Sequence, residues 1–206
     1  MSTLQSPFKP IAERGRPREF DTSAVIAAAA VAFREHGYHA TSIDDLCKAT
    51  GLLRGSLYAA FGDKRGILLA ALDHYSEVSL MRLAGTLNAP EPSRETLREA
   101  LMYYTRDSAA LFRQCGCLIT NMALEMLPQD TEVAERVQRV QQRMAGMLAD
   151  EVMRGQSAGV FAGDLDERAV GSFLLCIVQG LRVLGKVQHD EQTLRDAVEM
   201  AMRALA

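Results

Sequence analysis

The sequence predicts an all-α fold of about nine helices, and three observations support this prediction. Apolar residues recur at spacings of three and four along most of the chain, which is the period of one helix face. No stretch shows the alternation of apolar and polar residues that is typical of a strand. Capping residues and glycine or proline breaks divide the 206 residues into segments of helical length.

The first predicted helix covers residues 22–36, with Asp21 as its N-cap and Gly37 at its end. Asp63 caps a long fourth helix over residues 64–87, which links the N-terminal segment to the rest of the chain. Both helices show one apolar stripe. These stripes are Val25, Ala29, Ala32 and Phe33 in the first, and Leu68, Leu72, Tyr75, Ser79 and Arg82 or Leu83 in the fourth.

Residues 41–64 contain two short helical patterns that meet at a glycine. The first covers residues 42–50, and Gly51 allows the left-handed backbone that ends it. The second covers residues 54–61. Two helices joined by such a tight turn form a helix-turn-helix, whose second helix enters a DNA major groove.

The second helix of the motif has few apolar positions. Leu57 and Phe61 lie four residues apart and form its expected buried pair. Leu52 and Leu53, between the two helices, are expected to return to the core. The other positions of this helix are therefore free to face a partner.

The motif and the segment before it resemble the DNA-binding domain of the TetR/AcrR family of bacterial regulators. The matching residues keep their order over the first third of the chain: Phe33, His36, Gly37, Tyr38, Ala40, Thr41, Ser42, Ile43, Ala49, Gly51, Gly55, Leu57, Tyr58, Phe61, Lys64 and Leu68. The resemblance implies a ligand-responsive regulator, usually a repressor, that binds a palindromic operator as a homodimer. The rest of the chain supports it only through its helical pattern.

Each residue of the second motif helix has a candidate role on DNA. The planar Arg54 guanidinium matches the two major-groove acceptors of guanine, although a phosphate contact or a solvated side chain would also fit. Gly55 allows a close backbone approach, and Ser56 can donate to a phosphate or a base edge. Tyr58 could instead be a half-buried core residue. The resemblance implies that the remaining phosphate contacts come from Thr41, Ser42, Tyr58 and Lys64.

The predicted domain organisation has three parts. Residues 1–20 form a basic arm, in which Arg16 and Arg18 either follow a phosphate backbone or minor groove or are simply solvated. Residues 21–66 form the helix-turn-helix domain. Residues 67–206 form a ligand-binding and dimerisation domain, as the resemblance implies.

The net charge of −3 is unevenly distributed along the chain. Residues 1–66 carry nine Lys and Arg against seven Asp and Glu, whereas residues 67–206 carry 14 against 19. Only the first third has the sign expected of a phosphate-binding surface. No apolar run reaches the length of a membrane span and no secretory signal opens the chain, so we expect a cytoplasmic protein.

Five further helices are expected after the Pro-containing break at residues 88–92. They are a fifth from Ser93 to about 114, a sixth over 117–127 closed by Pro128, a seventh over 131–157, an eighth from Asp164 or Asp166 to about 186, and a ninth from Asp190 to the C-terminus.

The last two helices are the candidate dimer interface. The eighth is apolar over more than one face, and the resemblance implies a homodimer built from these two helices of each chain. Burial in the core of a single chain is the competing interpretation. The candidate interface residues are Phe173, Ile177, Leu181, Leu184, Leu194, Val198 and Ala201.

The resemblance also implies an effector pocket among the fourth to eighth helices. Methionine suits an adaptable cavity, but each candidate could equally be an ordinary core residue. The candidates are Met102, Tyr103, Cys117, Asn121, Met122, Met126, Met144, Met147 and Phe173. No metal site and no cofactor are predicted, and the sequence names no effector.

Cys115 and Cys117 flank a glycine at the start of the sixth predicted helix. Cys117 can be a structural residue, a thiolate that senses oxidants or electrophiles as in one branch of the family, or a soft-metal ligand together with Cys115. A regulator controlled by cysteine oxidation or a metal, without a small ligand, is therefore the alternative function. A cysteine-dependent enzyme is disfavoured because the four histidines are scattered.

Overall fold

The computed structural model describes residues 21–105, 115–187 and 190–206, and the regular structure in these ranges is entirely helical. The predicted arm, with Arg16 and Arg18, lies outside the described residues. The described helices are α1 (Thr22–His36), α2 (Ile43–Thr50), α3 (Arg54–Phe61), α4 (Lys64–Leu87), α5 (Arg94–Met102), α7 (Leu118–Met126), α8 (Thr131–Ser157), α9 (Glu167–Leu184) and α10 (Glu191–Ala204). None of them is long and apolar enough to cross a membrane.

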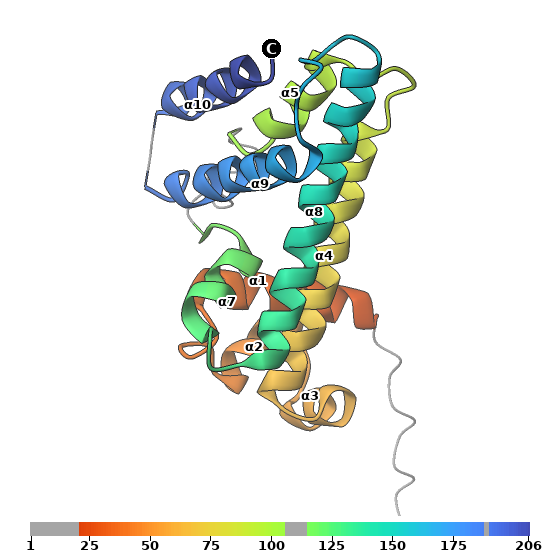
Figure 1. Cartoon of the computed structure of the whole chain (residues 1–206). Helices are drawn as coiled ribbons and strands as arrows, with labels where there is room; N and C mark the ends of the chain where they lie inside the picture. The colour runs from red at the N-terminus through yellow and green to blue at the C-terminus, as the bar shows by residue number, and fades with distance from the viewer. Residues whose placement is uncertain (1–20, 106–114, 188–189) are drawn as a thin grey trace, which may run out of the picture.

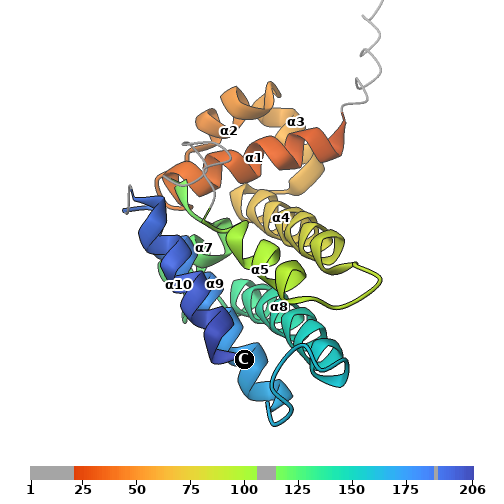
Figure 2. The ribbon, with the colours of Figure 1, turned by 90° about the horizontal axis from the view of Figure 1, so that it is seen from above.

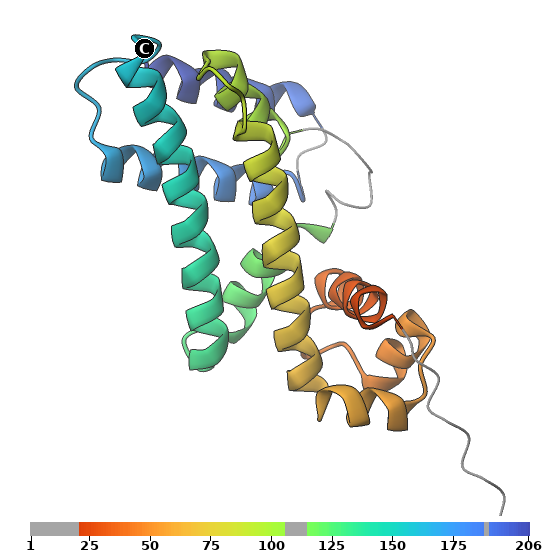
Figure 3. The same ribbon diagram turned by 90° about the vertical axis from the view of Figure 1, so that its right-hand side faces the viewer.

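Helices α4 and α8 lie side by side and run in the same direction, as Figures 1 and 3 show. Helices α1, α2 and α3 gather at the N-terminal end of α4, and α5, α9 and α10 surround its other end. Helix α4 therefore belongs to both halves of the molecule. Any tilt of α4 would move α3, which directly precedes it.

Ion pairs between partly exposed side chains connect the N-terminal halves of α4 and α8. Pairs of this kind add little stability, but they fix the register of the two helices. The pairs are Arg65 with Asp130 at 2.9 Å, Asp73 with Arg136 at 3.1 Å, and Glu77 with Arg143.

The predicted helix starts are confirmed by the capping residues. In each case a side-chain oxygen accepts a hydrogen bond from a backbone N–H of the first turn, which satisfies a group that the helix leaves unpaired. These caps are Asp21, Ser42, Asp63, Ser93, Asp166 and Asp190.

The prediction of a fifth helix reaching residue 114 is wrong at its C-terminal end. Helix α5 stops at Met102, and the amides of Tyr104 and Thr105 donate to carbonyls only three residues back. The Thr105 hydroxyl also donates to the Met102 carbonyl, at 2.9 Å, so side chain and backbone compete for the same acceptor. Residues 106–114 lie outside the described residues.

Leu53 does not return to the core, in contrast to the prediction. Its exposed fraction is 80%, whereas Leu57 in the following turn is completely buried. Leu52 is half-buried. The loop between α2 and α3 is too short for all three leucines to reach the same core, and Leu57 occupies the space.

Four of the seven predicted interface residues lie in the chain's own core. Helix α10 packs back against α5 and α9, which Figure 2 shows from above, and this packing buries the facing apolar stripes. The buried residues are Leu181, Leu194, Val198 and Ala201. Phe173 and Leu184 remain exposed and Ile177 is half-buried, so only these three face outward.

Candidate nucleic-acid interface

A capping box fixes the start of α2. The Ser42 hydroxyl accepts from the Asp45 amide at 3.1 Å, and the Asp45 carboxylate accepts from the Ser42 amide at 3.0 Å. Gly51, with φ of 71°, then ends the helix in the left-handed conformation that glycine tolerates best. Short-range interactions thus set the geometry of the helix-turn-helix.

Helix α3 is attached through one fully buried side chain. Leu57 is completely buried, and the exposed side includes Arg54, Gly55, Ser56 and Tyr58. The exposed fraction of Tyr58 is 40%, so it is not a core tyrosine. A short helix that exposes an arginine, a glycine and two hydroxyls at its first turns is suited to entering a groove.

The Arg54 guanidinium lies across the motif on α2. Its Nη2 donates to the Asp44 carboxylate at 2.7 Å, and both side chains are largely exposed. Four of its five N–H donors remain for another acceptor. Asp44 therefore orients Arg54 without using up its hydrogen-bonding capacity.

Lys64 begins α4 and ties it to the turn between α1 and α2. Its Nζ donates to the carbonyls of Tyr38 and Thr41, both at 2.9 Å, and lies 4.4 Å from the centre of the Tyr38 ring. An ammonium group has three donors, so one remains for a phosphate. Lys64 therefore first stabilises the packing of α4 against the head, by which we mean helices α1, α2 and α3. The sequence did not predict this structural role.

Thr41 is buried in the turn before α2. Only 1% of its surface is exposed, and its hydroxyl donates to the Gly37 carbonyl at 2.5 Å. The resemblance implies a phosphate contact from the hydroxyl or the amide of Thr41; the hydroxyl is used within the chain here, and the contact stays a prediction. The Thr41 side chain closes the turn that leads into α2.

Two family profiles match most of the chain. The profile of the "Bacterial regulatory proteins, tetR family" matches residues 25–71, and that of the "Tetracyclin repressor-like, C-terminal domain" matches residues 93–201. The chain belongs to the TetR family. Membership makes it a helix-turn-helix transcriptional regulator rather than an enzyme.

Individual TetR-family proteins resemble it over most of their length. The uncharacterised regulator YezE of Bacillus subtilis is 31% identical over 93% of this chain and 99% of its own. The repressor ComR of Escherichia coli is 31% identical over 82% and 81%. A cysteine mutant of the regulator CifR, solved with 26 bp double-strand operator DNA, is 30% identical, with a TM-score of 0.80 over 93% of this chain and 100% of that one.

In this TetR-family chain, α7 holds the DNA-binding head through one carboxylate. Glu125 accepts from the amides of Tyr38 and His39, at 2.9 and 2.7 Å, in the turn between α1 and α2. Asn121, one helical turn earlier, donates to the Arg34 carbonyl at the end of α1. A displacement of α7 would therefore be transmitted directly to the head.

We expect Glu125→Ala to lower the free energy of unfolding by about 2 kcal/mol, because two amides lose a charged acceptor. Urea denaturation followed by circular dichroism measures this change. Glu135→Ala is the matched control, since Glu135 is an exposed glutamate on the neighbouring helix α8. Equal stability of the two variants would show that Glu125 does not hold the turn.

The predicted sensing residues occupy several different places. Met122 and Met126 are buried in the core, and Phe173 is exposed on α9. The Tyr103 hydroxyl accepts from Arg82, and Met147 lines a separate surface crevice. A small cavity does lie between α4, α7, α8 and α9, and of the predicted sensing residues only Met144 lines it.

The cavity is lined by residues that the sequence analysis missed, notably Arg182, Gln179 and Tyr75. The signal in the sequence was a charged residue and a glutamine within the apolar run of α9. Such polar interruptions at buried positions usually have a partner or a ligand. For Tyr75, the sequence predicts only a place in the apolar stripe of α4.

Cys117 is the N-cap residue of α7 and is buried. Burial raises the pKa of its thiol. The nearby Arg182 guanidinium and hydrogen bonds from Thr120 and Tyr75 lower this pKa by more than burial raises it, so it lies below its ordinary value. A lowered pKa favours the reactive thiolate, whereas burial limits access to it.

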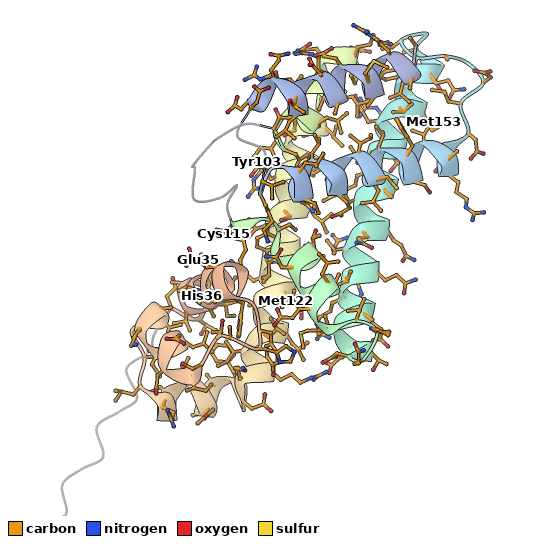
Figure 4. The ribbon with its side chains drawn as sticks, turned by 90° about the vertical axis from the view of Figure 1, so that its left-hand side faces the viewer. Glu35, His36, Tyr103, Cys115, Met122 and Met153 are labelled. Atoms are coloured by element: carbon orange, nitrogen blue, oxygen red, sulfur yellow. The ribbon has the colours of Figure 1, made fainter. Side chains whose placement is uncertain are left out.

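Cys115 lies elsewhere, against the end of α1 near Glu35 and His36 (Figure 4). It is half-buried, and its carbonyl accepts from Asn121 at 2.8 Å. Within the described ranges, no group of three or more His, Cys, Asp or Glu side chains is placed to hold a metal ion.

Proposed function

We propose that this regulator is a homodimeric repressor that binds a near-palindromic operator through α3 and leaves it when an effector occupies the C-terminal domain. The observation that carries the proposal is the exposed surface of α3. Leu57 is the one fully buried residue of this helix and attaches it to the rest of the domain. The likeness to CifR, solved with operator DNA, and to the repressor ComR supports it. Such a protein would act in the cytoplasm.

The proposed DNA contacts follow the positions of the side chains. Arg54 reads a guanine in the major groove, and Gly55 lets the backbone approach, since its Cβ direction is open. Ser42, Ser56 and Tyr58 contact phosphates, as does the third N–H of Lys64. Arg16 and Arg18 of the arm add backbone contacts. Residues 21–66 form the DNA-binding unit and residues 67–206 the sensing and pairing unit.

The proposed dimer uses the outward face of α9. Phe173, Val183 and Leu184 have exposed fractions of 37%, 45% and 49%, and Ile177 beside them is half-buried. Exposed apolar side chains in such a row are typical of a protein interface. A two-fold axis at this face would present two α3 helices to successive major grooves.

Footprinting on the region upstream of the protein's own gene tests the main proposal. We expect protection of two inverted half-sites whose centres are about 10 bp, or a multiple of that, apart. Sedimentation should give twice the 22.6 kDa mass of one chain. A monomer in solution would contradict the proposal. So would the absence of a protected sequence at protein concentrations at which random DNA remains unbound.

We expect Arg54→Ala to reduce the preference for the operator over a half-site variant by about 10- to 100-fold, because a bidentate base contact is lost. Competition gel-shift assays with the two DNAs measure this ratio. Arg139→Ala, which removes an exposed arginine from α8, is the control for the change in net charge. An equal loss on all sequences would instead assign Arg54 to a phosphate.

Control by cysteine oxidation is a second candidate for the switch, favoured by the lowered pKa of the Cys117 thiol. We expect Cys117→Ser to abolish release of the operator by hypochlorite or a quinone while leaving DNA affinity within about twofold. Cys176→Ser, at an exposed cysteine of α9, is the matched control. Full release of the Cys117→Ser protein would remove this thiol from the mechanism.

A further inference from the structure

We propose that the cavity around Arg182 binds a small organic anion, namely a carboxylate with a compact apolar body, as the effector. This inference rests on the proposed ligand-responsive function and adds the chemical class of the ligand. The cavity lies between α4, α7, α8 and α9, so a molecule inside it would touch the helix that carries the head and the helix that holds the head through Glu125.

Arg182 supplies the positive charge. It is half-buried, and its guanidinium lies 4.9 Å from the centre of the Tyr104 ring. The groups that act on it are the Cys117 thiol and the hydroxyls of Tyr104, Tyr75 and Tyr103, and no carboxylate of the described residues pairs with it. Partial burial of a cation without a carboxylate partner is costly, so we infer that an anion is the occupant that fits this site.

Four arginines elsewhere in the chain show the contrast. Each of them lies within 3.1 Å of a carboxylate oxygen of Asp or Glu on another helix or on a helix cap. These are Arg65, Arg98, Arg136 and Arg143. Arg182 thus differs from these four arginines, whereas Arg94 and Arg82 reach the Met202 carbonyl and the Tyr103 hydroxyl.

Neutral hydrogen-bond donors complete the polar side of the cavity. The Thr120 hydroxyl donates to the Gln179 Oε1 at 2.7 Å, which leaves the two amide N–H groups of Gln179 without an acceptor among the described residues. Gln141 and Ser79 also line the cavity, and neither side chain has a partner within the described ranges. Donors around a guanidinium, without a carboxylate, select an anion over a cation or a neutral amine.

The rest of the lining is apolar and includes Ile119 and Met144. A carboxylate at Arg182 would therefore place an aliphatic or aromatic body against these two side chains, and methionine adapts readily to such a body. A sugar or a polyol would leave its hydroxyls against them without partners.

The cavity is nearly closed in this conformation. Its volume is about 10 Å³, which is room for about one water molecule. An organic anion can enter only when the surrounding helices separate, so it binds an expanded state better than the present one. A ligand with that preference shifts the population away from the closed state, and α4 and α7 move with it.

The Cys117 thiolate is the alternative counter-ion. It already accepts hydrogen bonds from Thr120 and Tyr75, and a guanidinium has five donors, so the thiolate leaves most of the Arg182 donors unused. The two occupants are separable by experiment, because only one of them requires an added ligand.

Calorimetric titration and thermal melting of the full chain test the proposal with benzoate, phenylacetate and hexanoate, against benzamide, phenylacetamide and hexanamide as neutral counterparts. We expect at least one carboxylate to bind and to raise the melting temperature by about 5–10 °C at 100 times its Kd, with no shift from its amide. The same carboxylate should release the operator.

Arg182→Gln should weaken carboxylate binding by about 10- to 100-fold, since a hydrogen-bonded charge pair is lost. Arg168→Gln makes the same change at an exposed position of the same helix and should bind like the parent protein. Gln179→Glu keeps an acceptor for Thr120 and places a carboxylate in the cavity beside Arg182. It should fold normally and lose binding of the added carboxylate.

Three results would overturn the proposal: no carboxylate binds at 10 mM, the amides bind equally well, or Arg182→Gln binds like Arg168→Gln. A rise in the Cys117 pKa in Arg182→Gln, without carboxylate binding by the parent, would identify the thiolate as the counter-ion. Failure of the ligand-free protein to protect any operator would defeat the proposed function instead, and the titrations would still decide the chemistry of the cavity.

Discussion

Leu57→Ala is expected to lower the free energy of unfolding by about 2–5 kcal/mol and to abolish specific operator binding. Leu57 is completely buried and is the fully buried residue of α3, so truncation leaves a cavity under the recognition helix. The helix has only eight residues and no side-chain cap at its start, so it has few other constraints.

Urea denaturation and gel-shift titration of the same protein preparation measure both effects. Leu53→Ala is the matched control, because it removes the same atoms from a side chain that is 80% exposed only four residues earlier. We expect its stability to change by less than about 0.5 kcal/mol. Similar losses in the two variants would mean that Leu57 does not anchor α3.

Gly66→Ala is expected to destabilise the protein by about 3 kcal/mol, in spite of the better helix propensity of alanine. A Cβ at position 66 would lie 2.0 Å from the carbonyl oxygen of Phe61, which is the last residue of α3. Neither this Cβ nor the Phe61 carbonyl oxygen can move by a side-chain rotation. The steric clash can therefore be removed only if α3 moves relative to α4. Operator affinity should fall together with stability.

Gly85→Ala provides the comparison for this steric effect. Gly85 lies in the same helix, and a Cβ there would meet no atom within 4 Å. We expect this variant to gain up to about 1 kcal/mol, because alanine loses less conformational freedom in a helix. If thermal melting placed both variants above the parent protein, the close contact between α3 and α4 would be refuted.

Helix boundaries were largely predictable because their causes are local. Ser42 and Asp45 cap α2 within three residues of one another, and Asp63 caps α4 in the same way. The residue ranges expected for α1, α3, α4 and α8 are those observed. The end of α5 is harder to predict, because the helical pattern of the sequence continues past Met102, whose carbonyl accepts from the Thr105 hydroxyl.

The functional residues were harder to assign because many of them interact over long distances in the sequence. Lys64 resembled a phosphate contact, but its ammonium spans 26 residues to the Tyr38 carbonyl and 23 to that of Thr41. Glu125 reaches 87 residues back to the Tyr38 amide. The periodicity and residue spacing of the sequence do not predict these hydrogen bonds.

The sequence by itself therefore determined the all-α class, most helix boundaries, the helix-turn-helix and the family, since all of these rest on interactions within one turn or on a contiguous motif. Only the tertiary structure decided which apolar stripe is covered, as at Leu194 under α5 and α9, and which cation has no carboxylate partner among the described residues, as at Arg182. The physical reason is that burial and charge pairing depend on neighbours from other helices. Those neighbours are fixed by packing and not by position in the chain.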